Sequence, residues 1–286
     1  MTRGTLVPAI RYALLAAALV FAAAQAQNPP TGAPSLSAVP GSPGDLLVVG
    51  EELEYHVSYA FFHLGKIVIR VLDRYERNGR TVYRAEAVIN SAAGIPFVNL
   101  HIRFISDFDE QLFSYRWSAE DSSSSGVAMR VLTFDYDSGR VFAARGKKLE
   151  DGRFEPDSVD TVAITSRCQD GLSLFFFARG NVLQKASMNV PTFIEKEQVN
   201  TFFDFTHQIL DEEIDPVDYP IKVVEFEGRA DFVGVFGLTG GFEGRFSHDH
   251  ARIPIVAWMK VILGSIKVKL VRWTRPGWAP PRFVEQ

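Results

Sequence analysis

The sequence predicts a mainly β fold, a curved antiparallel meander that forms a barrel or half-barrel around one short internal helix. Apolar and polar residues alternate with a period of two through most of the chain after residue 50. Residues that favour hairpin turns separate these runs. Roughly a dozen strands in one flat sheet would leave costly edges, so we expect the sheet to curl.

Residues 1–26 are interpreted as an export signal peptide. Arg3 and Arg11 supply positive charge, residues 12–24 form an apolar run, and Ala24-Gln25-Ala26 provides a small-x-small cleavage site. The apolar run is short for a helix that crosses a bilayer, so we expect cleavage before Gln27 and no membrane span in the mature chain.

The rest of the chain divides into three parts by composition. Residues 27–45 are rich in Pro, Gly and Ser and are predicted to form a disordered tether. Residues 46–275 are predicted to form a single antiparallel β domain, and residues 276–286 a C-terminal tail. Without the two arginines of residues 1–26, the chain has 28 basic and 34 acidic residues, and this net charge of −6 argues against nucleic acid and anionic membranes as partners. Cys168, the single cysteine, is expected to be a small buried side chain.

The first predicted strand follows Gly50, where Leu53, Tyr55 and Val57 alternate with polar residues. Further predicted strands share this pattern and occupy residues 67–71, 98–104, 127–136, 140–145, 199–207, 221–226, 229–236, 242–247, 254–262 and 266–273. The turn residues between them are Asn78-Gly79, Asp137-Ser138-Gly139, Asp151-Gly152, Gly240-Gly241 and Gly264-Ser265.

Residues 170–179 interrupt the strand pattern and predict a short helix. Asp170 is the expected N-cap and Gly180 the expected residue after the C-terminus, which allows about three turns. Phenylalanines on most of its faces indicate that the helix is buried. A helix inside a β meander is expected to cover the concave face of the sheet, where a ligand would also bind.

Three segments carry a resemblance to a known family: Gly50-Glu51-Glu52-Leu53 with Tyr55 and Gly65, the helix entry 169–173, and residues 246–254. Together they resemble an exported bacterial family of domains of unknown function, the thirty-one-oh-eight family, over about residues 46–272. The resemblance implies a periplasmic or outer-surface β protein of a Gram-negative bacterium, without established catalytic residues. His248 and His250 depart from the family pattern, in which acidic residues are commoner.

No residue is predicted to be catalytic, to bind a metal or to hold a cofactor. His248 and His250 lack a visible third ligand, so we interpret them as part of a polar turn capped by Asp249. The chain contains no G-x-S-x-G motif, and the serine run 122–125 is interpreted as a solvated loop. Asp107, Asp109 and the acidic stretch 211–215 are interpreted as surface charge.

The 23 phenylalanines give the best functional indication. Consecutive phenylalanines in a strand point to both faces of a sheet, so some need apolar cover beyond the main core. Such cover could be a ligand or a partner surface, and the alternative is a fully packed two-layer core. The candidate ligand-binding residues are Phe175, Phe176, Phe177, Phe203 and Phe205.

The leading hypothesis is a non-enzymatic periplasmic protein that binds or carries a lipid or other apolar envelope component. The alternative is an interaction protein that assists envelope or surface-polysaccharide assembly through an envelope protein partner. A hydrolase is the third hypothesis.

Overall fold

The computed structural model describes residues 46–95, 99–230, 240–260 and 265–285. They form one 14-stranded sheet and helix α3 (Gly171–Asn181), so the predicted mainly β fold is confirmed. The strands of the first half are β1 (Glu52–Tyr59), β2 (Phe62–Arg77), β3 (Arg80–Ser91), β4 (His101–Asp109), β5 (Ser114–Ser123), β6 (Gly126–Asp135), β7 (Arg140–Lys148) and β8 (Phe154–Ala163). The strands of the second half are β9 (Ala186–Ile194), β10 (Glu197–Glu212), β11 (Ile221–Ala230), β12 (Gly241–Ser247), β13 (Pro254–Lys260) and β14 (Ser265–Thr274).

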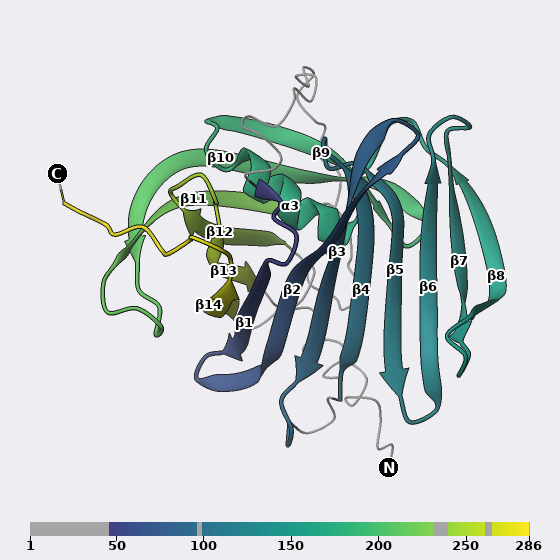
Figure 1. The fold of residues 1–286 in the computed structure, drawn as a ribbon, viewed down its shortest axis with the longest axis horizontal. Helices are drawn as coiled ribbons and strands as arrows, with labels where there is room; N and C mark the ends of the chain where they lie inside the picture. Colours follow the sequence, from purple (N-terminus) through teal and green to yellow (C-terminus); the bar gives the residue numbers. More distant parts are fainter. Residues whose placement is uncertain (1–45, 96–98, 231–239, 261–264, 286) are drawn as a thin grey trace, which may run out of the picture.

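The sheet is an antiparallel meander with one long-range junction. Each strand pairs with its neighbour in sequence, except that β8 and β9 do not pair and β1 pairs with β14. The sheet therefore has two arms, β1 to β8 and β14 to β9, which are joined where the first and last strands meet. Figure 1 shows the two arms curling toward one another with α3 between them. The sheet is curved and open, as in the predicted half-barrel, and does not close into a barrel.

The segment that connects β8 to α3 covers the free edge of β9. Gln169 forms a parallel bridge with Thr192, and its backbone N–H donates to the carbonyl of Pro191 at 2.9 Å. An ion pair of 3.0 Å joins Arg130 of β6 to Glu195, which follows β9. The backbone contacts of Gln169 satisfy groups of β9 that an open sheet would otherwise expose.

The period-2 pattern finds most strands but misses β3, β5, β8 and β9. β3 is buried on both faces and β8 is exposed on both, so neither shows a clean alternation. The loop predicted at 122–125 is partly wrong, because Ser122 and Ser123 belong to β5. Of the strand predicted at 229–236, the structure describes only Arg229 and Ala230, which are the last two residues of β11. The rest of that predicted strand lies outside the described residues, as do Val98, residues 261–262 and Gly264.

Helix α3 begins as predicted and ends later. Asp170 is the N-cap, but Gly180 lies inside the helix, which continues to Asn181. No left-handed residue ends the helix, because the C-cap Val182 has a φ of −59°, in the right-handed region. Arg252 donates to the Gly180 carbonyl at 2.6 Å and the Asn181 amide to that of Phe177 at 2.8 Å.

The last described residues pack against β11. Ile221 forms a bridge with Arg282, whose guanidinium lies 4.0 Å from the ring centroid of Tyr219. Trp278 is buried and its indole N–H donates to Asp249 at 2.8 Å. The C-terminal tail therefore contributes to the folded body.

Candidate functional site

Asp170 fixes the start of α3 to the first arm of the sheet. One carboxylate oxygen accepts from the backbone N–H groups of Leu172 and Ser173, at 2.8 and 2.9 Å. The other accepts from the hydroxyls of Ser106 on β4 and Ser114 on β5, at 2.5 and 2.7 Å. Burial raises the pKa of Asp170, although all four hydrogen bonds oppose that shift. The cluster caps the helix and is closed to solvent.

A buried ion cluster fixes the end of α3. The guanidinium of Arg179 donates to both carboxylate oxygens of Glu51, at 2.5 and 2.8 Å, and to the carbonyl of Ala251 at 3.0 Å. Arg275 donates to the same carboxylate. Burial by itself would raise the pKa of Glu51, but Arg179 and then Arg275 hold it below its ordinary value. Both ends of α3 are thus tied to the sheet by buried polar groups.

The three candidate phenylalanines of α3 differ in burial. Phe176 is fully buried against Phe108 of β4, with ring centroids 5.1 Å apart. Phe177 is buried against Phe203 of β10 at 5.7 Å. Phe175 is only half-buried and meets the ring of Phe176 edge-on at 5.2 Å. The helix therefore packs on both arms and leaves one ring partly uncovered.

The two candidates on β10 belong to a larger aromatic cluster. Phe203 stacks on Phe205 at 5.6 Å, and both rings pack against Phe226 of β11. Phe203 also meets Phe242 of β12 at 5.6 Å. The structure thus brings Phe177, Phe203 and Phe205 together, whereas Phe176 packs in a separate contact with Phe108.

Phe226 and Phe242 also belong to this cluster, although the sequence did not predict them as candidates. The sequence feature that accompanies them is a pair of glycines, Gly244 and Gly228. Phe226 pairs across the strands with Gly244, and Phe242 with Gly228. A Cβ atom on Gly228 would lie 2.1 Å from the ring of Phe242, and one on Gly244 would lie 2.3 Å from that of Phe226. Each ring occupies space that only a glycine leaves free.

A row of apolar residues crosses the inner face of β1 and of the adjoining second arm. Its members are successive cross-strand partners from β1 to β9, and we call them the apolar row: Tyr59, Ile266, Met259, Phe242, Gly228, Phe203 and Met188. Ile266 and Phe203 are buried in the core, whereas Tyr59, Met259, Phe242 and Met188 are only partly buried. At a strand spacing of about 4.8 Å, the row follows about 29 Å of sheet.

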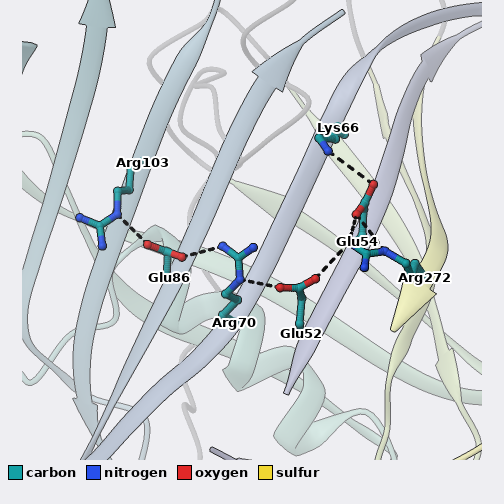
Figure 2. Close-up of polar contacts among 7 residues, drawn as sticks. All are labelled: Glu52, Glu54, Lys66, Arg70, Glu86, Arg103 and Arg272. Carbon is teal, nitrogen blue, oxygen red and sulfur yellow. Dashed lines mark hydrogen bonds and ion pairs between the residues drawn. The ribbon is translucent and has the colours of Figure 1, made fainter. Parts of the chain in front are cut away.

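The outer face has the opposite character. Figure 2 shows alternating ion pairs that link Arg103, Glu86, Arg70, Glu52, Arg272, Glu54 and Lys66 across β4, β3, β2, β1 and β14. Glu86 receives 2.6 Å and 2.8 Å contacts from Arg103 and Arg70. The face of β1–β4 and β14 that carries these pairs is therefore charged.

The other sequence-predicted residues have structural roles. Cys168 is buried as predicted, and burial raises the pKa of its thiol to about 12. His248 and His250 lie in a bend after β12, where Asp249 accepts from the backbone N–H groups of Ala251 and Arg252. The polar turn capped by Asp249 is therefore confirmed. The described residues contain no group of three or more potential metal ligands among His, Cys, Asp and Glu.

The interpretation of Asp107 and Asp109 as surface charge is wrong. Both residues are buried, because arginines cover their carboxylates. Arg84 binds Asp107 through two hydrogen bonds of 2.7 and 2.9 Å, and Arg167 binds Asp109 at 2.5 Å. In the stretch 211–215, Glu212 pairs with Arg245 at 2.6 Å, so its charge is also partnered.

A comparison with protein-family models finds one match. A family model described as "Protein of unknown function (DUF3108)" matches residues 54–271, which confirms the resemblance seen in the sequence. No curated protein matches. A β-barrel-like protein of domain of unknown function DUF1849 from Brucella abortus is 10% identical with a TM-score of 0.48, and the match covers 80% of this chain and 98% of that one. A Bacteroides fragilis protein with a YmcC-like fold is 8% identical over the same shares, with a TM-score of 0.27.

Within the described ranges, no helix combines the length and apolar character that a membrane crossing requires.

Proposed function

The chain belongs to the DUF3108 family of proteins of unknown function, and on that premise we propose that it is a non-enzymatic periplasmic protein that binds a lipid or other apolar envelope component on its concave face. The observation that carries this proposal is the apolar row, whose members Tyr59, Met259, Phe242 and Met188 keep part of their side chains uncovered. Export is supported by the signal-like residues 1–26.

The shape and chemistry of the row suit an acyl chain. The acyl chains of one leaflet occupy about 15 Å, half of the hydrocarbon core of a bilayer, and the row is longer than that. Flexible methionines and aromatic rings adapt to a chain of variable shape. The row contains no polar side chain that could bind a specific headgroup. We therefore expect the protein to bind apolar chains in general rather than one particular molecule.

The buried polar groups support a binding role over a catalytic one. Asp170 and Glu51 are both committed to holding the ends of α3, and each has its carboxylate oxygens occupied by donors. A catalytic acid or base needs access to a substrate. Neither carboxylate offers that access, because both residues are almost fully buried.

A fluorescent fatty acid tests the proposal. The purified chain, freed of bound material by organic extraction and refolding, should bind the probe saturably. Phe242→Ala should weaken binding about tenfold, because the ligand loses one aromatic contact. Phe142→Ala is the matched control, since Phe142 of β7 is also partly exposed but lies outside the row. Absence of saturable binding, or an equal effect of the two changes, would reject the proposal.

An interaction protein that assists envelope assembly is the second candidate, and one observation favours it. β8 is an edge strand whose side chains are mostly exposed, with Val159 57% exposed. A strand from another protein could extend the sheet there. Native mass spectrometry of protein taken from its own periplasm separates the two candidates, because a bound lipid supports the first and a bound chain the second.

A further inference from the structure

The turn between β1 and β2 presents two phenylalanines to solvent. Phe61 and Phe62 are 88% and 59% exposed, and Phe61 is the most exposed large apolar side chain in the part of the chain that the structure describes. Their ring centroids lie 4.8 Å apart, so the two rings form one apolar knob. Ala60, directly before them, has a φ of 50°, a backbone conformation that costs free energy for a residue other than glycine.

Three lysines lie on the strands near this aromatic tip. Lys66 follows it on β2 with its side chain 48% exposed, and Lys267 of β14 pairs with Ser58 at the end of β1. Lys260 is exposed at the end of β13, where it pairs with Ser265. Lys66 forms an ion pair with Glu54 at 3.7 Å, and Lys267 lies 3.8 Å from Glu212 and 5.1 Å from the ring centroid of Trp258.

The tip lies at the open end of the apolar row. Phe62 pairs across the hairpin with Tyr59, the first residue of the row. In Figure 1 the β1–β2 hairpin lies at the lower edge of the sheet.

We propose that the Phe61–Phe62 tip inserts into the interfacial region of a lipid bilayer and docks the protein there. Two phenylalanine rings offer about 300 to 500 Å², which is less than a stable protein interface of about 1,000 Å² requires. A projecting apolar knob with flanking lysines is instead typical of an interfacial anchor, in which the rings enter the acyl boundary and the lysines reach the headgroups.

The net charge of the chain refines this inference. The chain has a formal net charge of −4, so its overall charge does not attract it to anionic membranes. Binding must therefore come from the tip, with apolar insertion as the main contribution and the local lysines as orienting groups. The docking inference does not depend on whether the concave face holds a ligand.

A fluorescent label at the tip tests the inference directly. The introduced thiol of Phe61→Cys can be modified selectively with a nitrobenzoxadiazole label, because Cys168 is buried and its thiol pKa is raised to about 12. With vesicles of phosphatidylethanolamine and phosphatidylglycerol, we expect a blue-shifted emission and quenching by brominated acyl chains. Phe142→Cys, labelled in the same way on β7, is the matched control and should show neither effect.

A second variant tests membrane insertion without a fluorescent label. The double change Phe61→Ser and Phe62→Ser should reduce the vesicle-bound fraction in flotation by at least about tenfold, while Phe142→Ser leaves it unchanged. Retention of the fold is checked by the thermal unfolding midpoint. An emission shift that depends on protein concentration without vesicles would assign the tip to a second copy and overturn the inference. Unchanged emission with vesicles, or equal flotation of the double variant, would also overturn it.

Discussion

The guanidinium of Arg179 in the last turn of α3 donates to both carboxylate oxygens of Glu51, which lies 128 positions earlier in the chain, directly before β1. Arg275, just after β14, donates to the same carboxylate. One buried acid therefore joins the first strand, the helix and the segment after the last strand. This cluster sits beside the β1–β14 junction that unites the two arms.

Glu51→Ala should be strongly destabilising. It leaves Arg179 and Arg275 buried without their carboxylate, and removing one partner of a buried ion pair costs about 3 to 5 kcal/mol. Glu52→Ala is the matched control, because Glu52 is the next residue and also pairs with two arginines but is partly exposed. We expect it to lose about 0 to 1 kcal/mol. Urea unfolding measures both values, and similar losses for the two variants would contradict a special role for the buried cluster.

The two buried carboxylates should respond to pH in opposite directions. Arginines lower the folded-state pKa of Glu51 below its ordinary value of 4.5, so the unfolded chain binds the proton more tightly. The stabilisation that Glu51 provides is complete above pH 4.5 and is lost as the pH falls through the folded-state pKa. Burial raises the pKa of Asp170 above 3.8, so its contribution becomes less favourable as the pH rises from 3.8 through the raised value.

Glu51→Gln should therefore flatten the increase of stability with pH in the acid range, whereas Asp170→Asn should steepen it. Unfolding free energies from pH 3 to pH 7, measured for both variants and the wild type, check the two slopes. Changes of the same sign would show that one of these pKa directions is wrong.

The fold could be predicted from the sequence because most strands bury one face, as the alternation of Leu53, Tyr55 and Val57 shows. Local signals also gave the N-cap Asp170, whose partners Leu172 and Ser173 are sequence neighbours. The end of α3 could not be predicted, because the group that satisfies the Gly180 carbonyl comes from Arg252, 72 residues away.

The same distinction explains the site. A strand of unknown register gives no cross-strand partners, so the phenylalanines 203 and 205 could be proposed but the row from Tyr59 to Met188 could not. The burial of Asp107 and Asp109 depends on Arg84 and Arg167, which the fold brings from other segments. Both the apolar row and the burial of the two aspartates depend on residues that are far apart in the sequence, and the local residue pattern does not encode such pairing.

The three phenylalanines of α3 should respond unequally to truncation. Phe176→Ala and Phe177→Ala remove fully packed rings and should each cost about 3 to 5 kcal/mol, the usual range for a buried phenylalanine. Phe175→Ala should cost clearly less, because its ring is only half-buried. Denaturant unfolding of the three variants measures the difference, and three equal and severe losses would show that Phe175 is ordinary core.

Gly244→Ala should destabilise the second arm. The added Cβ would lie 2.3 Å from the buried ring of Phe226, and forcing such a group into a packed core costs about 1 to 3 kcal/mol. Gly241→Ala, on the same strand, has no atom nearer than 3.6 Å and should be close to neutral. A thermal midpoint for Gly244→Ala that equals that of Gly241→Ala would mean that the ring moves aside without cost.

Gln169→Met should stabilise the protein. Gln169 is fully buried, yet its side-chain Nε2 and Oε1 atoms have no hydrogen-bond partner among the described residues. A buried polar group without partners costs about 1 to 3 kcal/mol, and methionine fills a similar volume without that cost. The control is Gln198→Met, because the Gln198 amide accepts from the Thr165 N–H at 2.7 Å and donates to Ser166 at 2.7 Å. Losing those bonds should lower stability by about 0.5 to 1.5 kcal/mol. Opposite shifts of the urea midpoint are therefore expected, and a loss of stability in Gln169→Met would reveal that a buried water pairs with the amide.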